Sequence, residues 1–367
     1  MIMVDYNDQI KALQDEIKKT KYNKATQGHI GIVKAKIAQL KQRQEERVSQ
    51  KTGKSDHGYT VRKSGDGTVL LLGFPSAGKS TLLNTLTGAH SEVAAYAFTT
   101  LTCIPGMMEY KQSKIQILDV PGIVAGAASG RGRGREVLAV IQSADLVLVI
   151  VDVMQPEHLP AILREVWEAR IRLNRKRPEV FIKKKAMGGI QIGKTVPLEI
   201  DDDTIRKILR EFKMMNAEVL IRSPIDIDSL IDCIEGSRKY VPAIICVTKA
   251  DLVDAETLDN VMHQLNADIA ISAAQSYNIE VLKETIFQKL DFIRVYLKEP
   301  RKEADMKLPL IIMRNSSIQD VCNKLHKDFV AKFKFARVWG KSTKFPGQKL
   351  MTNHVLTDGD ILEIHLR

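Results

Sequence analysis

The 367-residue sequence contains no run of 18 apolar residues, so it predicts no membrane-spanning helix. Its first residues, MIMVDYNDQIKALQDEIKK, lack the layout of a signal peptide. Only four cysteines are present (Cys103, Cys233, Cys246 and Cys322), and their spacing fits neither a metal site nor a disulfide framework. Two of them lie in apolar runs, as buried thiols do in a reducing compartment. We therefore expect a cytoplasmic protein without a membrane segment.

Acidic residues are in deficit, and the deficit is uneven along the chain. The 55 Lys and Arg exceed the 44 Asp and Glu, which leaves a net charge of +11. Residues 1–70 carry 14 basic and 8 acidic side chains (net +6), and residues 298–367 carry the same numbers. The remaining residues, 71–297, carry 27 and 28 (net −1). Two separate basic regions favour a polyanionic partner such as RNA or the ribosome. Lysine-rich faces that only keep the protein in solution are the alternative.

Apolar periodicity divides the chain into five regions. Residues 1–48 show helical spacing twice and predict a helical hairpin, with a long coiled coil as the alternative. Residues 49–66 are a polar linker. Residues 67–164 and 241–297 alternate strands with helices, which predicts an α/β domain with a mainly parallel sheet. Residues 165–240 exceed any simple crossover and predict an inserted subdomain. Residues 298–367 predict a small α+β module.

The alternating pattern places individual elements in the α/β domain. We expect strands at 68–73, 107–110, 114–118, 146–151, 243–247 and 269–271. We expect helices near 79–88, 133–143, 255–265 and 279–296. The stretch MMEYKQSKIQIL predicts a hairpin, so one strand of this sheet is expected to be antiparallel.

The stretch GFPSAGKS, from Gly73 to Ser80, follows the apolar strand TVLLL and precedes the helix STLLNTL. It matches G-x-x-x-x-G-K-[ST], a loop whose backbone N–H groups and helix N-terminus bind phosphates. A chance glycine-rich turn is the alternative, and the strand-to-helix context argues against it. We expect Lys79 to reach the outer phosphates and Ser80 to bind Mg²⁺. The loop residues predicted to contact the nucleotide are Gly73, Pro75, Ser76, Ala77, Gly78, Lys79, Ser80 and Thr81.

Two further segments are predicted to respond to the terminal phosphate. DVPG, at Asp119–Gly122, follows a predicted strand about forty residues after Lys79. Asp119 can hold the Mg²⁺ shell, and the Gly122 N–H can contact the terminal phosphate. FTTLT, at 98–102, can complete the Mg²⁺ shell with a hydroxyl when a third phosphate is present. Thr100 is the candidate, with Phe98 and Thr99 beside the nucleotide. Threonines of a β-edge are the alternative.

Two segments at later strand ends are predicted to read the base. In TKAD, Thr248–Asp251, the Asp251 carboxylate can accept hydrogen bonds from two guanine donors that adenine lacks. Lys249 is expected to lie along the base. In SAA, backbone N–H groups of Ser272, Ala273 and Ala274 can face the base oxygen. Five motifs in this order, each at a predicted strand end, predict a site for GTP and GDP.

Four stretches carry a family resemblance: GFPSAGKSTLLN, SEVAAYAFTTLTCIPG, DVPGIVAGAASGRGRGREVLAV and HVLTDGDILEIH. Over essentially the whole chain, the sequence resembles the developmentally regulated GTP-binding proteins (DRG), a family of Obg-related GTPases. The resemblance implies a P-loop GTPase (G) domain, an N-terminal helical hairpin, an S5D2L-like domain at 165–240 and a C-terminal TGS domain of β-grasp fold. It also implies association with ribosomes and a DRG family regulatory protein as partner, in a chain that is a monomer or part of a heterodimer.

Carried over by this resemblance, the catalytic residues are Lys79, Thr100 and Gly122, and the metal ligands are Ser80 and Thr100. Three positions depart from related GTPases. Thr248 stands where most have Asn, which ties the base loop to the phosphate loop. Ile123 stands where Ras-like enzymes have a water-orienting Gln. Ser76 stands where potassium-stimulated relatives have Asn, which leaves a role for K⁺ open.

We therefore predict slow hydrolysis of GTP to GDP and phosphate, in a nucleotide-dependent switch that acts on ribosomes. Because Ile123 cannot orient water, a second function is compatible with the same residues. That alternative is a non-catalytic scaffold that binds RNA or ribosomes and uses GTP as a structural ligand.

Overall fold

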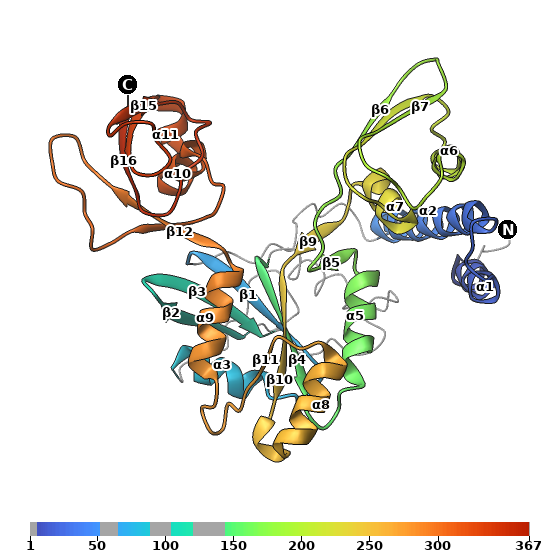
Figure 1. Ribbon diagram of the computed structural model, residues 1–367, viewed down its shortest axis with the longest axis horizontal. Helices are drawn as coiled ribbons and strands as arrows, with labels where there is room; N and C mark the ends of the chain where they lie inside the picture. Colours follow the sequence, from blue (N-terminus) through green and yellow to red (C-terminus); the bar gives the residue numbers. More distant parts are fainter. Residues whose placement is uncertain (1–5, 52–64, 89–103, 120–143, 367) are drawn as a thin grey trace. The chain divides into compact units, whose positions relative to one another are not determined.

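The computed structural model describes residues 6–51, 65–88, 104–119 and 144–366 (Figure 1). The chain divides into two compact units. The first unit consists of residues 1–58 and 170–240, and the second of residues 59–169 and 241–367. Several predicted features lie outside the described residues: the helix at 133–143, and the residues Phe98, Thr99, Thr100, Gly122 and Ile123.

A six-stranded sheet forms the centre of the second unit. Its strands are β1 (Gly67–Leu72), β2 (Ile104–Tyr110), β3 (Ser113–Asp119), β4 (Leu146–Asp152), β10 (Ala243–Thr248) and β11 (Ile269–Ala270). They run in the order β11-β10-β4-β1-β3-β2. All neighbouring pairs are parallel except β2 with β3, which confirms the predicted hairpin. β1 and β4 are buried along their whole length, as central strands covered on both faces are.

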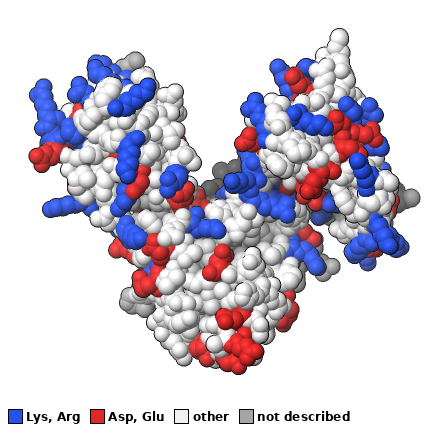
Figure 2. Space-filling view, viewed as in Figure 1, with Lys and Arg blue, Asp and Glu red and all other residues white. Residues whose placement is uncertain are grey.

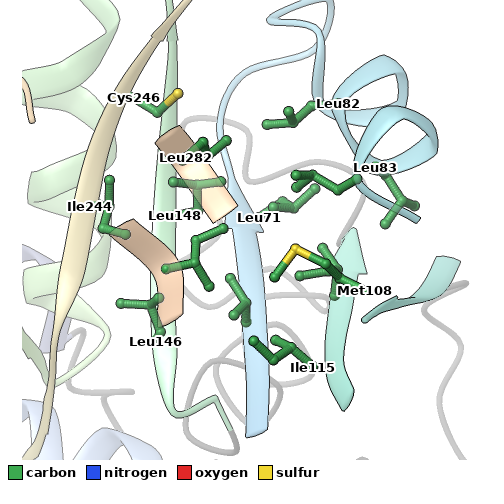
Figure 3. Close-up of a cluster of buried hydrophobic side chains, with 14 of the residues drawn as sticks. Leu71, Leu82, Leu83, Met108, Ile115, Leu146, Leu148, Ile244, Cys246 and Leu282 are labelled. Carbon is green, nitrogen blue, oxygen red and sulfur yellow. The ribbon is translucent and has the colours of Figure 1, made fainter. Parts of the chain in front are cut away.

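Helices follow these strands. They are α3 (Lys79–Thr87), α5 (His158–Glu168), the 3₁₀ helix η1 (Ala250–Leu252), α8 (Ala255–Leu265) and α9 (Ile279–Lys289). Of these, α3, α8 and α9 begin where the sequence predicted helices, whereas α5 and η1 were not predicted. Leu82 and Leu83 of α3 and Leu282 of α9 join Leu71 and Leu148 of the sheet in one hydrophobic core (Figure 3). This packing holds the loop between β1 and α3 at the carboxyl ends of the parallel strands.

The helix predicted at 279–296 ends earlier, at Lys289. Asp291 has a φ of 51°, outside the right-handed helical region, and the β-branched and aromatic residues of FIRVYL after it favour a strand. These residues form strand β12 (Phe292–Leu297) of a second, five-stranded sheet. That sheet therefore begins before residue 298, the boundary expected from the sequence.

The C-terminal sheet runs in the order β13-β12-β16-β14-β15. Its other strands are β13 (Leu310–Met313), β14 (Phe333–Trp339), β15 (Gln348–Leu350) and β16 (Asp360–Leu366). Two helices accompany it, α10 (Ile318–Leu325) and α11 (Lys327–Lys332). His326 between them has an extended backbone, which separates the two helices. Ser317 and Asp320 cap α10 reciprocally, which sets its first turn.

The first unit combines the N-terminal helices with the inserted segment. Its helices are α1 (Tyr6–Lys19), α2 (Gln27–Lys51), α6 (Asp202–Glu211) and α7 (Ile227–Glu235). Its strands form a three-stranded sheet, β6 (Val180–Lys184), β8 (Ala217–Ile221) and β7 (Ile190–Lys194), and a two-stranded sheet, β5 (Ile171–Leu173) and β9 (Lys239–Val241). Acids begin α6 and α7: Asp201 and Asp226 each accept a hydrogen bond from a first-turn N–H.

The helical hairpin and the inserted segment share one hydrophobic core. Ile30 and Ala35 of α2 pack in a cluster with Ile208 of α6 and Leu230 of α7. A methyl group added at Gly31 of α2 would lie 3.0 Å from Ile208 Cδ1, so the two helices approach closely. The sequence predicted the hairpin and the subdomain as separate regions, and the structure joins them. Among the described residues, no helix combines the length and apolar character needed to cross a membrane.

Candidate nucleotide-binding site

The loop between β1 and α3 requires its glycines. A Cβ at Gly73 would lie 2.6 Å from the carbonyl oxygen of Ile150 on the neighbouring strand β4. Gly78 has a φ of 86°, in the left-handed region that side chains rarely adopt. The next residue, Lys79, begins α3, so the loop ends at a helix N-terminus, where anions bind.

The Lys79 side chain crosses back over this loop. Its Nζ donates hydrogen bonds to the carbonyl oxygens of Gly73 (3.0 Å) and Phe74 (2.9 Å). Burial lowers the pKa of Lys79, and the nearby Asp119 carboxylate opposes that shift. The ammonium group is therefore held inside the curve of the loop, where it can contact phosphate oxygens.

Asp119 and Ser80 come from two different elements and meet at the same place. The Ser80 hydroxyl donates to Asp119 Oδ2 at 3.0 Å. Asp119 is only 3% exposed, and within the described part of the chain its other oxygen, Oδ1, has no hydrogen-bond partner. A buried carboxylate oxygen without a partner, beside a hydroxyl oxygen, fits a hard cation that prefers oxygen ligands, such as Mg²⁺.

Thr248 links the base loop to the phosphate loop. Its buried hydroxyl lies 2.8 Å from the carbonyl oxygen of Ala77 and 3.2 Å from that of Val151. Thr248 is one of the three positions that depart from related GTPases, most of which have Asn there. The structure shows that the shorter threonine side chain also reaches the phosphate loop.

The other predicted base-reading residues lie at neighbouring strand ends. Asp251 is exposed in η1, directly after β10. The Ala250 N–H donates to the Ile271 carbonyl oxygen (3.1 Å), which joins the two base loops. The Ser272 N–H already donates to the Tyr277 carbonyl oxygen (3.2 Å). We therefore expect the following residues, Ala273 and Ala274, rather than Ser272, to offer N–H groups to a base.

Asp152 is a candidate site residue that was not predicted from the sequence. Its Oδ2 forms an ion pair with Lys249 Nζ at 2.6 Å, and its Oδ1 accepts a hydrogen bond from the Met154 N–H at 3.0 Å. This pair fixes the direction of the lysine that is predicted to lie along the base. A signal was present, because the apolar strand LVLVIVD ends in an acid just as β3 ends in Asp119.

A ring contact joins the phosphate loop to α5. The rings of Phe74 and His158 stack with centroids 4.1 Å apart and planes inclined by 22°. Phe74 also supplies one of the carbonyl oxygens that Lys79 contacts. Neither ring was among the predicted site residues.

The candidate site residues therefore lie together at the carboxyl ends of the strands of the six-stranded sheet. The phosphate loop, Asp119, Asp152 and the two base loops all follow the carboxyl ends of parallel strands, where α/β sheets bind ligands. Thr100 and Gly122 lie outside the described residues.

Family models match almost the whole chain from β1 onward. Residues 68–185 match a model described as a 50S ribosome-binding GTPase, and residues 187–292 match the C-terminal region of the same domain. Residues 293–366 match the TGS domain, which agrees with the assignment of β12 to the C-terminal sheet. With the phosphate loop and the parallel sheet, these matches define a P-loop GTPase of α/β fold that carries a C-terminal TGS domain.

Similar proteins cover the full length. The chain is 50% identical over 365 residues to an uncharacterised GTP-binding protein of Methanocaldococcus jannaschii, covering 98% of this chain and 93% of that one. It is 41% identical over 361 residues to developmentally-regulated GTP-binding protein 1 of Xenopus laevis, covering 97% of each chain. It is 41% identical over 362 residues to developmentally-regulated G-protein 3 of Arabidopsis thaliana, also covering 97% of each. The chain belongs to the developmentally regulated GTP-binding protein family, as the sequence motifs predicted.

The Thr248 link can be tested directly. Thr248→Val keeps the volume but removes the hydroxyl that reaches Ala77, and we expect GDP affinity to fall about 5-fold, since one hydrogen bond contributes about 1 kcal/mol. Titration with a fluorescent GDP analogue measures the change. Thr285→Val is the matched control, because the Thr285 hydroxyl also donates to a carbonyl oxygen but lies on α9. Equal affinities for the two variants would contradict the role assigned to Thr248.

Proposed function

We propose that the protein hydrolyses GTP slowly with Mg²⁺ and acts in the cytoplasm as a nucleotide-dependent switch on ribosomes. GTP binding and the GTPase class follow from the family; Mg²⁺, the slow rate and the ribosome are the proposal. The observation that carries it is the buried Oδ1 of Asp119, which has no partner within the described residues and lies next to Ser80 and the phosphate loop.

Different residues of the site would bind the phosphates and hold Mg²⁺. Lys79 and the loop N–H groups bind the outer phosphates, and Ser80 and Asp119 would hold Mg²⁺, with Thr100 completing its shell. Mg²⁺, when bound, would neutralise charge on the phosphate oxygens. We expect Gly122 to contact the terminal phosphate through its N–H. Ile123 cannot orient a water molecule as glutamine does, so hydrolysis should be slow without a partner.

The ribosomal role rests on other support. The matching family model is described as a ribosome-binding GTPase, and the chain carries a net charge of +11, which suits RNA. The resemblance to the family adds a DRG family regulatory protein as a second partner. Stimulation by K⁺ has to be tested, because Ser76 stands where potassium-stimulated relatives have asparagine.

Phosphate release from GTP under multiple turnover tests this function. We expect the isolated chain to turn over below about 0.1 s⁻¹, in the range of unassisted GTPases. Assays with and without ribosomes, in sodium and then in potassium buffer, show whether either accelerates hydrolysis. Lys79→Ala should release no phosphate above background, whereas Lys302→Ala, a variant of an exposed lysine, should match the unmodified chain.

Two results would contradict the proposal in different ways. Rapid release by the isolated chain would show that the site orients water without Gln, and the slow rate would be wrong. Tight GTP binding with no release above that of Lys79→Ala, even on ribosomes, would favour the non-catalytic scaffold instead.

A further inference from the structure

Nearly all of the net charge lies in the first unit. Residues 1–58 and 170–240 contain 28 Lys and Arg and 18 Asp and Glu, a net charge of +10. Residues 59–169 and 241–367 contain 27 and 26, a net charge of +1. In Figure 2, Lys and Arg side chains are spread over the visible face of the unit that contains α2, α6 and α7, with acids between them. A polyanion is therefore attracted chiefly to this unit.

The three-stranded sheet of this unit has one covered and one open face. Val180 and Ile182 of β6 pack against the core of the unit. Strand alternation places Phe181 and Lys183 on the opposite face, and Phe181 is 57% exposed. Across the sheet, Phe181 pairs with Leu220 of β8, which in turn pairs with Gly193 of β7. Because Gly193 has no side chain, β7 does not cover the apolar surface formed by Phe181 and Leu220.

One cation contacts the exposed ring, and another follows on the same face of the sheet. The Arg222 guanidinium lies 5.5 Å from the centroid of the Phe181 ring, within the range of a cation–π contact. Lys183 follows on the same face, opposite Glu218, and Glu218 forms an ion pair with Lys185 at 2.8 Å. An aromatic ring flanked by cations on an open sheet is the arrangement on which unpaired bases stack while phosphates bind the cations.

We propose that the outer face of β6, β8 and β7 binds single-stranded RNA, with one base stacked on Phe181 and phosphates on Lys183 and Arg222. Duplex RNA is disfavoured because its bases are already stacked and cannot reach the ring. The proposal rests on the proposed ribosomal role for the source of the RNA, but the binding itself can be measured without ribosomes. It places an RNA contact in the inserted segment, for which the sequence indicated no role.

The ring is tested by fluorescence anisotropy of a labelled single-stranded RNA with the full chain bound to GDP. We expect Phe181→Ala to weaken binding about 5- to 150-fold, the usual range for the loss of one base–aromatic stack. Phe345→Ala is the matched control, because Phe345 is 58% exposed but lies in the C-terminal domain. We expect that variant to bind as the unmodified chain does. Unchanged binding by Phe181→Ala would overturn the proposal, as would equal loss in both variants.

The phosphate contact is tested by the salt dependence of the same binding. Lys183→Gln should reduce the slope of log affinity against log salt concentration by about 0.7, the value for one phosphate contact on a single strand. Lys344→Gln, at an exposed lysine of the C-terminal domain, should leave the slope unchanged. A slope unaffected by Lys183→Gln, or duplex RNA competing as well as the single strand, would overturn the proposal.

Co-sedimentation with ribosomes separates this proposal from the function on which it rests. A chain that binds the single strand through Phe181 but does not sediment with ribosomes would support the RNA face and contradict the ribosomal role. A chain that sediments with ribosomes but binds no single-stranded RNA would support the ribosomal role and contradict the RNA face.

Discussion

Asp251→Asn is expected to lower GDP affinity by about 100-fold, because one of the two carboxylate oxygens predicted to accept from guanine is replaced by an NH2 group, which faces the guanine amino group donor to donor. Asp251 is exposed in η1 at the carboxyl end of β10, and Lys249 before it has a φ of 59°, which turns the chain there. An amide offers one donor in place of an acceptor, so the variant should prefer a xanthine base, whose second oxygen replaces the guanine amino group. Titration calorimetry with GDP and xanthosine diphosphate measures both changes.

A nearby acid provides the control for this change. Asp259 is exposed on α8 and lies in none of the motifs, so Asp259→Asn should leave the affinity for both nucleotides unchanged. If Asp251→Asn keeps the original preference for GDP over xanthosine diphosphate, the assignment of Asp251 to base recognition is wrong.

Asp232→Ala is expected to destabilise the first unit by about 3–5 kcal/mol, the usual cost of removing one partner from a buried ion pair. Asp232 accepts hydrogen bonds from Arg172 Nε (2.7 Å) and Nη2 (2.9 Å) and from Arg238 Nε (2.6 Å). The side chains of Arg172 and Asp232 are only 4% and 5% exposed, so the variant leaves two guanidinium groups facing a position without charge. These contacts hold α7 against the strands β5 and β9 at which the inserted segment begins and ends.

Hydrogen exchange of the full chain measures this effect, because it reports each unit separately. Amides of α7 should exchange much faster in Asp232→Ala, while those of β10 in the second unit should not change. Asp228→Ala is the matched control on the same helix, because its ion pair with Lys34 is partly exposed and contributes at most about 1 kcal/mol. Equal protection of α7 in the two variants would contradict the role of the buried cluster.

The sequence predicted most of the second unit well because its signals are local. The phosphate loop is one continuous stretch between an apolar strand and a helix. Its glycines are required because a side chain at Gly73 would meet β4 and because Gly78 has a positive φ. The segment after Lys289 was predicted wrongly as helix because apolar residues at 292, 293, 295 and 297 suit a helix almost as well as a strand. Pairing with β13 and β16 decided between the two.

By itself, the sequence determined the α/β fold, the order of the GTPase motifs and the family, because these depend on residues that are neighbours in the chain. Only the tertiary structure decided which distant residues meet. The Asp152–Lys249 pair spans 97 residues, and the contact between Thr248 and Ala77 spans 171. It also decided that the N-terminal hairpin shares a core with the inserted segment, which collects a net charge of +10 in one unit. Periodicity shows which face of an element is buried, but the partner against which it packs depends on the shape and contacts of the folded chain.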